Sequence, residues 1–153
     1  MKTKDKLPPL VLGWREYIDL PEWGVTRLRA KIDTGARTSA IHVENLEELP
    51  GGRVRFEVIV CEKPLKTVTV EAMPTRRTTV KPSSGHRQKR WVMRTTMVVG
   101  PLEHDIELSL VSRESMLNRM LVGRKALPPH VLVNPNRTYR VSRKRLPRKS
   151  KEK

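Results

Sequence analysis

The residues best suited to carry chemistry lie in one short segment, Asp33-Thr34-Gly35-Ala36. Glycine lets the backbone come close to a carboxylate, and a threonine hydroxyl can tie the turn to a partner by hydrogen bonds. Two aspartates held about 3 Å apart share one proton, so that one activates water as a base while the other polarises a carbonyl. The segment therefore predicts amide-bond hydrolysis, with Asp33, Thr34 and Gly35 as catalytic residues.

The second carboxylate of such a pair has to come from elsewhere, because the chain contains this turn once. We favour Asp33 of a second copy in a two-fold homodimer. Within one chain the candidates are Asp19, Asp105 and Glu107. The alternative interpretation of the segment is a surface turn closed by an Asx-type hydrogen bond, without chemistry.

The elements that must position this turn are predicted to be strands. Residues 27–32 alternate polar and apolar, which predicts a strand with Leu28, Ala30 and Ile32 on its buried face. Residues 38–43 are expected to return as the second strand of a hairpin-like unit. Further strands are expected at 54–60, 66–72, 91–99, 106–111 and 131–133, the first two of them paired.

Between these strands, residues 74–90 are predicted to be a loop with its tip at 82–85, and residues 115–120 a single helical turn. The sequence has no amphipathic helix of about ten or more residues, so the predicted fold class is all-β, a closed barrel. Residues 11–140 are expected to form one domain, with a flexible tail at 1–10 and a disordered basic tail at 141–153.

Composition restricts the core and the compartment. Of the 153 residues 37% are hydrophobic and 4% aromatic, which predicts an aliphatic core. The single cysteine, Cys61, excludes an internal disulfide. No stretch approaches the roughly 18 apolar residues that span a bilayer, so we expect a cytoplasmic chain without a membrane partner.

The net charge of +16 predicts polyanionic partners. Residues 137–153 contain nine basic residues and one acid, and this tail could hold a ribosome or RNA. A second cluster has no acidic residue between its ends and is the candidate substrate-binding surface. Its members are Arg76, Arg77, Lys81, Arg87, Lys89 and Arg90.

Several segments together resemble one bacterial family. They are GWRE at 13–16, AKIDTGARTSAIH at 30–42, VKPSSGH at 80–86, IELSL at 106–110, RMLVGRKAL at 119–127 and LVNP at 132–135. They resemble the retropepsin-like, RimB-like family, often labelled ATP-dependent zinc protease. The resemblance implies a barrel like one half of pepsin. It also implies an association with RimK-type ligases, which add glutamates to a ribosomal protein.

Carried over from the resemblance, Asp33 is the catalytic aspartate, Thr34 and Gly35 form its turn, and Gly123 belongs to the segment that passes beside it. Ala36 and Arg37 of the extended turn are assigned to substrate binding. The implied activity is an aspartic-type peptidase acting on an acidic or polyglutamylated ribosomal-protein tail. The alternative is a non-catalytic module on the same fold that binds a ribosome, RNA or a ligase.

No cofactor or metal is expected. Zinc proteases need histidines at helical spacing, as in His-Glu-x-x-His, whereas the four histidines here are scattered. A Gly-x-x-x-x-Gly-Lys-Ser/Thr loop for ATP is also missing from the sequence.

Overall fold

The computed structural model describes residues 7–80, 88–112 and 118–142. Within them the secondary structure is almost entirely strand, as predicted. The strands are β1 (Leu10–Leu20), β2 (Val25–Ile32), β3 (Ser39–Glu48), β4 (Val54–Glu62), β5 (Leu65–Ala72), β6 (Arg76–Val80), β7 (Gln88–Val99), β8 (Leu102–Val111), β9 (Met120–Val122) and β10 (Val131–Thr138). Three single-turn 3₁₀ helices join them: η2 (Pro21–Trp23), η3 (Pro50–Gly52) and η4 (Arg124–Ala126).

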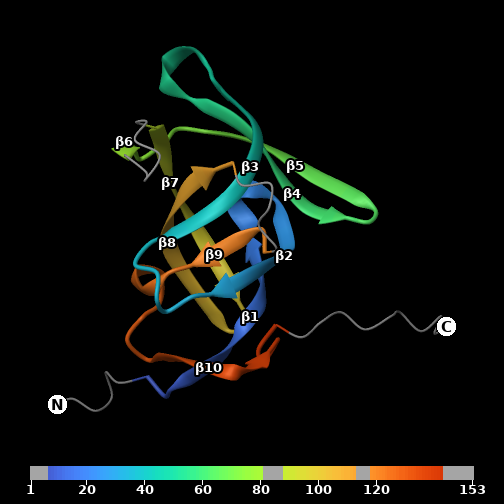
Figure 1. Cartoon of the computed structure of the whole chain (residues 1–153), viewed down its shortest axis with the longest axis vertical. Coiled ribbons are helices and arrows are strands. Elements are labelled where there is room, and N and C mark those ends of the chain that lie inside the picture. The colour runs from blue at the N-terminus through green and yellow to red at the C-terminus, as the bar shows by residue number, and fades with distance from the viewer. Residues whose placement is uncertain (1–6, 81–87, 113–117, 143–153) are drawn as a thin grey trace.

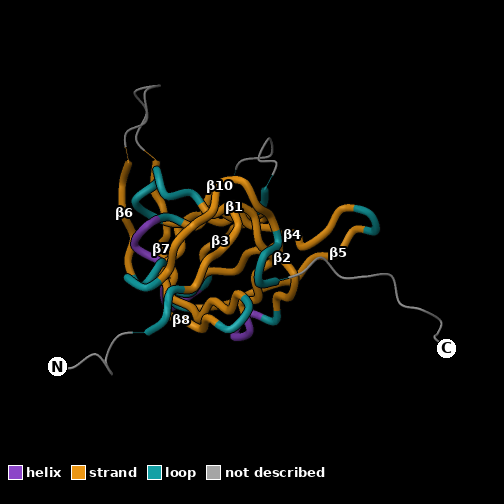
Figure 2. Tube along the Cα trace, turned by 90° about the horizontal axis from the view of Figure 1, so that it is seen from below, coloured by secondary structure: helices purple, strands orange, loops and turns teal. Residues whose placement is uncertain are grey.

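Six strands close into a barrel, which confirms the predicted fold class. Their order is β1-β2-β9-β3-β8-β7, and β7 returns to β1 where Val98 pairs with Asp19. The remaining strands extend this ring: β10 pairs with β1, β6 with β7, and the β4–β5 hairpin with β3. In Figures 1 and 2 the far end of that hairpin stands out to one side of the barrel.

The core is aliphatic, as the composition predicts. Every strand of the barrel contributes side chains that are almost completely buried, including Leu12, Leu28, Ile41, Met97, Leu108 and Met120. Burying each such side chain contributes about 1.5–3 kcal/mol. The aromatic members of the core, Trp23 and Phe56, meet edge to face with ring centroids 5.2 Å apart.

Two predictions about pairing can be compared directly with the structure. The strands 54–60 and 66–72 do pair, as β4 and β5. The prediction that residues 27–32 and 38–43 form a hairpin-like unit is wrong, because β9 lies between β2 and β3 and pairs with both. Alternation within a strand reports which face is buried, but it carries no information about which strand lies alongside.

The prediction of a loop over 74–90 is also wrong at both ends. Residues 76–80 form β6 and pair with the first residues of β7, which begins at Gln88. Their threonines and arginines lack the apolar alternation that marks a half-buried strand, so the sequence pattern missed them. Residues 81–87, including the predicted loop tip, lie outside the described part of the chain, as do 113–117 of the predicted helical turn.

The ends of the described chain are well anchored. β1 begins at Leu10, close to the predicted start of the domain. Residues 141 and 142, which the sequence placed in the basic tail, pack on the barrel: Val141 lies against the core, and the Ser142 hydroxyl donates to Glu16 (2.6 Å). Residues 1–6 and 143–153 lie outside the described residues. Among those described, no helix is long and apolar enough to cross a membrane.

Candidate active site

The Asp33 turn follows directly from β2 and is closed by its own backbone. The Gly35 N–H donates to Asp33 Oδ1 (2.9 Å), and the Ala36 N–H donates to the Asp33 carbonyl (3.1 Å). The Asp33 N–H donates to the Val122 carbonyl (2.8 Å), which continues the pairing of β2 with β9. The Gly35 N–H thus holds the carboxylate, and two further hydrogen bonds hold the Asp33 backbone at the end of β2.

Gly123 lies against this turn, as the sequence analysis expected of the passing segment. Its N–H donates to Ser39 Oγ (2.9 Å). A Cβ at this position would lie 2.4 Å from the Thr38 carbonyl oxygen, so the crossing requires glycine. The next two residues extend the contact: the Arg124 N–H donates to the Ala36 carbonyl (2.8 Å) and the Lys125 N–H to that of Arg37 (3.0 Å).

The turn faces solvent in the single chain. The Asp33 side chain is 28% exposed, and Lys31 Nζ lies 3.9 Å from its Oδ2. Thr34, Gly35 and Arg37 are exposed. Arg124 Nη1 donates to the Thr34 carbonyl (3.0 Å). The half-buried Asp33 carboxylate thus lies at the surface of the single chain, beside the Lys31 cation.

Each intrachain candidate for a second carboxylate accepts a hydrogen bond from a partner other than Asp33. Asp19 accepts from the Arg27 N–H (2.8 Å), and Arg27 lies six residues before Asp33, or about 20 Å along an extended strand. Asp105 accepts from Thr96 Oγ1 (2.9 Å), and Glu107 accepts from Arg76 Nη2 (2.7 Å). No carboxylate among the described residues is hydrogen-bonded to that of Asp33 or to its immediate turn.

A cavity of about 270 Å³ lies beside the turn and contains part of the predicted binding cluster. Its wall includes Thr38 and Ser39, which follow the turn, together with Arg76, Glu107 and Lys125. The hydrogen bond from Arg76 lowers the pKa of the Glu107 carboxyl below its ordinary value, against the opposing effect of burial. The cavity thus contains both positive and negative side chains next to Thr38 and Ser39, the residues that follow the turn.

The other described members of the predicted cluster lie with Arg76 on the paired strands β6 and β7 but do not line this cavity. Arg77 lies 3.9 Å from Glu48 and over the Trp91 ring, because neighbouring residues of a strand face opposite ways. Lys89 and Arg90 line a different cavity of about 880 Å³ together with Glu44. Lys81 and Arg87 lie outside the described residues. The structure therefore brings Asp33, Ala36, Arg37 and Gly123 together, and Arg76 is the one described member of the basic cluster that lines the adjoining cavity.

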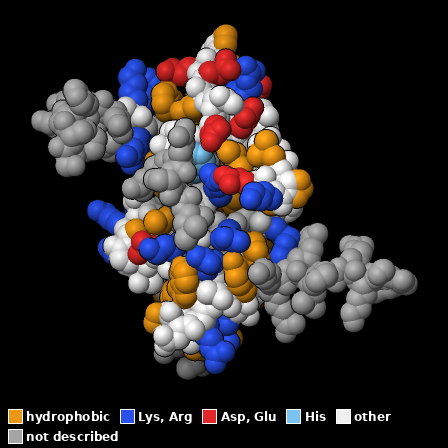
Figure 3. All heavy atoms as spheres, turned by 45° about the vertical axis from the view of Figure 1, so that its right-hand side comes forward, with side chains coloured by type: hydrophobic (Ala, Val, Ile, Leu, Met, Phe, Trp, Pro, Cys, Tyr) orange, Lys and Arg blue, Asp and Glu red, His pale blue; other side chains and the backbone are white. Residues whose placement is uncertain are grey.

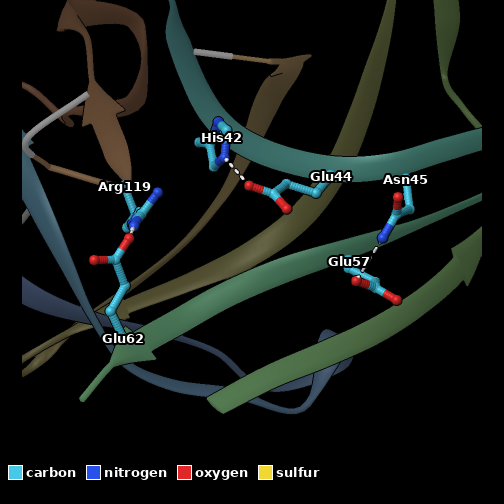
Figure 4. Close-up of polar contacts among 6 residues, drawn as sticks. All are labelled: His42, Glu44, Asn45, Glu57, Glu62 and Arg119. Carbon is cyan, nitrogen blue, oxygen red and sulfur yellow. Dashed lines mark hydrogen bonds and ion pairs between the residues drawn. The ribbon is translucent and has the colours of Figure 1, made fainter. Parts of the chain in front are cut away.

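The metal-ligating residue types do not gather in the described part of the chain. No group of three or more His, Cys, Asp or Glu side chains there could hold a metal ion. His42 is completely buried and its Nε2 lies 3.2 Å from Glu44 Oε2 (Figure 4). His104 and His130 line a cavity of about 960 Å³ together with several prolines.

Two contributors to the site were missed by sequence reasoning, Ser39 and Arg124. The Ser39 hydroxyl accepts from the Gly123 N–H, and the Arg124 guanidinium donates to the Thr34 carbonyl. Neither contact leaves a local signal in the sequence, because each joins residues more than 80 positions apart.

Comparison with known proteins identifies the family. A family model described as RimB-like, retropepsin-like aspartic endopeptidase RimB, matches residues 11–144. The chain belongs to the RimB-like family. The match includes the Asp33 turn, β9 and the whole barrel, so the family resemblance inferred from the motifs is confirmed.

Curated relatives of this RimB-like chain carry another name. Proteins from Shewanella pealeana and Desulfotalea psychrophila, each named probable alpha-L-glutamate ligase, are 32% and 33% identical to it over 133 and 129 residues. The matches cover 84% and 82% of this chain but 29% and 28% of those proteins. The RimB-like chain thus spans less than a third of the length of these relatives.

A solved structure has the same fold. A Legionella pneumophila protein of unknown function superposes with a TM-score of 0.70 at 26% identity, over 86% of this RimB-like chain and 97% of that one.

Proposed function

We propose that this chain is an aspartic-type peptidase of the retropepsin class that cleaves an acidic, glutamate-extended tail of a ribosomal protein. The observation that carries the proposal is the Asp33 carboxylate, held at the end of β2 by the Gly35 N–H and flanked by the glycine crossing at Gly123. Ala36, Arg37 and Gly123 would contact the substrate backbone, and Thr34 would join the two halves of the site.

The proposed chemistry needs two copies of the turn. Water attacks the amide carbon, and the ionised Asp33 of one copy takes a proton from that water. The protonated Asp33 of the other copy donates its proton to the carbonyl oxygen, which gives a neutral tetrahedral diol. The diol then collapses: the protonated Asp33 donates to the nitrogen as the C–N bond breaks, and the ionised Asp33 takes a proton from one hydroxyl of the diol. A carboxylic acid and an amine leave, and the pair again shares one proton.

Charge and family relatives support the choice of substrate and partner. A chain with a net charge of +16 attracts acidic tails. Arg76 is the member of the predicted basic cluster beside the turn, and Arg77, Lys81, Arg87, Lys89 and Arg90 would act as a wider guiding field. Related segments occur inside proteins named glutamate ligases, which supports a RimK-type ligase as the working partner and glutamate-tailed protein as the shared substrate.

The net charge alone favours a second function class, one that does not use the Asp33 turn. In it the chain is a non-catalytic module that holds a ribosome, RNA or the ligase through its basic surfaces, and Asp33 only closes a turn. Neutralising the basic residues would then abolish function, whereas Asp33→Asn would be tolerated.

The test is mass spectrometry of a glutamate-extended ribosomal-protein tail incubated with the wild type or with Asp33→Asn. We expect cleavage by the wild type at one class of bond and at least a hundredfold slower cleavage by the variant. Glu57→Gln, which removes the same charge from an exposed carboxylate bonded to Asn45, is the matched control. An uncleaved tail that binds the wild type and Asp33→Asn equally, and less tightly as salt rises, would favour the binding module.

A further inference from the structure

A second basic groove lies on the side of the barrel, apart from the cluster that the sequence indicated. It is a cavity of about 610 Å³ between β2 and the turn joining β4 to β5. Five cationic side chains and one carboxylate line it: Arg27, Arg29, Lys63, Lys66, Arg119 and Glu62. Figure 3 brings this side forward: blue side chains spread over the middle of the molecule, and red ones gather at its upper end.

The single carboxylate in this lining already has a partner. Glu62 forms an ion pair with Arg119, whose side chain is 15% exposed (Figure 4). The pair joins the end of β4 to the residue before β9 within the lining of the groove. Arg29 of β2 lines the same cavity as Lys63 and Lys66 at the end of the hairpin, and the described residues of the lining include no second acid.

Arg27 is directed into this groove by an unusual backbone. Its φ is +56°, in the left-handed region that non-glycine residues seldom adopt. The register of β1 and β2 shifts here, between Ile18 and Leu20, so Arg27 lies in a β-bulge. Bulges redirect side chains, and such strain persists where the surroundings hold it. Here the Arg27 guanidinium lies 4.3 Å from the centre of the Tyr17 ring.

The groove lies apart from the Asp33 turn, but Arg29 of the groove and Asp33 of the turn face the same outer side of the sheet. Leu28, Ala30 and Ile32 point into the core, so Arg29, Lys31 and Asp33 follow one another on the outer face of β2. Steps of two residues advance about 6.6 Å, which puts Arg29 about 13 Å along the strand from Asp33. An extended peptide covers that distance in about four residues.

We propose that this groove is an exosite that binds the carboxylates of an acidic peptide segment about four residues or more from the bond to be cleaved. The proposal rests on the proposed peptidase function and names where its substrate is held. The side chains of an extended peptide repeat at the same period as those of β2, so alternate glutamates can meet successive cations.

A peptide fits this groove better than a nucleic acid. Single-stranded nucleic acids gain much of their binding from bases stacked on aromatic rings. Tyr17 is the aromatic residue among the described side chains that line the groove. Its ring is already stacked on Tyr139, with centroids 4.7 Å apart, and carries Arg27 over it.

The test is a comparison of two double variants with the same change in charge. Arg29→Glu with Lys66→Glu reverses two groove cations, whereas Arg53→Glu with Arg137→Glu reverses two exposed cations elsewhere. Binding of fluorescent hexaglutamate is measured by anisotropy at low salt, with circular dichroism and a thermal midpoint as folding checks. We expect the groove variant to bind about tenfold more weakly than the wild type, and the control less than threefold.

A second readout uses the exposed thiol of Cys61, which also lines the groove. Hexaglutamate should slow alkylation of Cys61 by iodoacetamide in the wild type and in Asp33→Asn, but not in the groove variant. Because Asp33→Asn removes cleavage and keeps the groove, protection without cleavage separates the exosite from the peptidase. Equal loss of binding in both double variants would overturn the exosite, as would a groove variant that loses oligouridylate but keeps hexaglutamate.

Discussion

A short Asp-Thr-Gly turn can be interpreted either as an Asx-type surface turn or as a site of chemistry, and the Asp33 carboxylate has features of both. Its Oδ1 accepts from the Gly35 N–H, as in an Asx turn, and the same hydrogen bond fixes the carboxylate at the end of a core strand. The local hydrogen bond therefore does not argue against chemistry. What converts such a turn into a catalytic one is a second carboxylate that shares its proton.

Glu107 provides a pH-dependent test of the cavity beside this turn. The hydrogen bond from Arg76 lowers its pKa. A carboxyl with a lowered folded-state pKa stabilises the fold above its unfolded pKa of about 4.3, and this contribution is lost as the pH falls through the lowered value. We expect Arg76→Ala to raise the Glu107 pKa toward its ordinary value and to remove that contribution. NMR titration of the Glu107 carboxyl carbon measures it.

The same titration in Arg77→Ala is the control, because Arg77 contacts Glu48 instead. A Glu107 pKa that remains equally low in Arg76→Ala would mean that the charges of Arg94 and Lys125, which also lower it, are sufficient without the hydrogen bond.

At the scale of elements, the site depends on a three-residue strand. β9 runs parallel to β2 and antiparallel to β3, and so places Gly123 beside the start of β3. The segment after β10 is held in place by a side chain of β1, that of Glu16. Glu16 on β1 is completely buried, and its carboxylate accepts from the N–H groups of Gly13 (2.6 Å) and Arg140 (2.9 Å) and from the Ser142 hydroxyl (2.6 Å).

This buried carboxylate should be a large contributor to stability. Hydrogen bonds to a charged group are worth about 1.5–3 kcal/mol each. In Glu16→Gln an amide NH₂ replaces one acceptor and faces N–H donors, so we expect the free energy of unfolding to fall by about 2–4 kcal/mol, measured by urea denaturation. Glu57→Gln, at an exposed site bonded to Asn45, should change it by about 0.5 kcal/mol or less. Equal losses in the two variants would contradict this role for Glu16.

The whole molecule is a closed barrel that presents the Asp33 turn at its surface. On the proposed function, an active unit contains two chains, each contributing Asp33. This predicts that cleavage per chain rises with protein concentration until dimers saturate. It also predicts that a wild-type chain loses its activity when it pairs with an inactive chain.

A mixing experiment measures this directly. With wild type and Asp33→Asn in equal amounts, random pairing leaves roughly a quarter of the dimers with two aspartates, so activity should fall to roughly a quarter of that of the same total amount of wild type. Independent monomers would retain roughly half. Retention of half the activity would therefore exclude a shared pair.

The sequence by itself determined the strand-rich fold class, the aliphatic core and the turn that carries Asp33. Each of these is a local property: the alternation of Leu28, Ala30 and Ile32 fixes which face of β2 is buried, and Gly35 follows its aspartate directly. The family motifs also pointed to Gly123, but not to the Thr38 carbonyl that requires a glycine there.

Which strands are neighbours and which charges meet became known from the three-dimensional fold. The fold inserts β9 between β2 and β3, places Arg76 at one cavity but Lys89 and Arg90 at another, and joins Arg29, Lys66 and Arg119 in one groove. Periodicity reports the face of a residue but not its partner across the sheet, because pairing is set by contacts between distant parts of the chain. The function of this protein depends on such contacts.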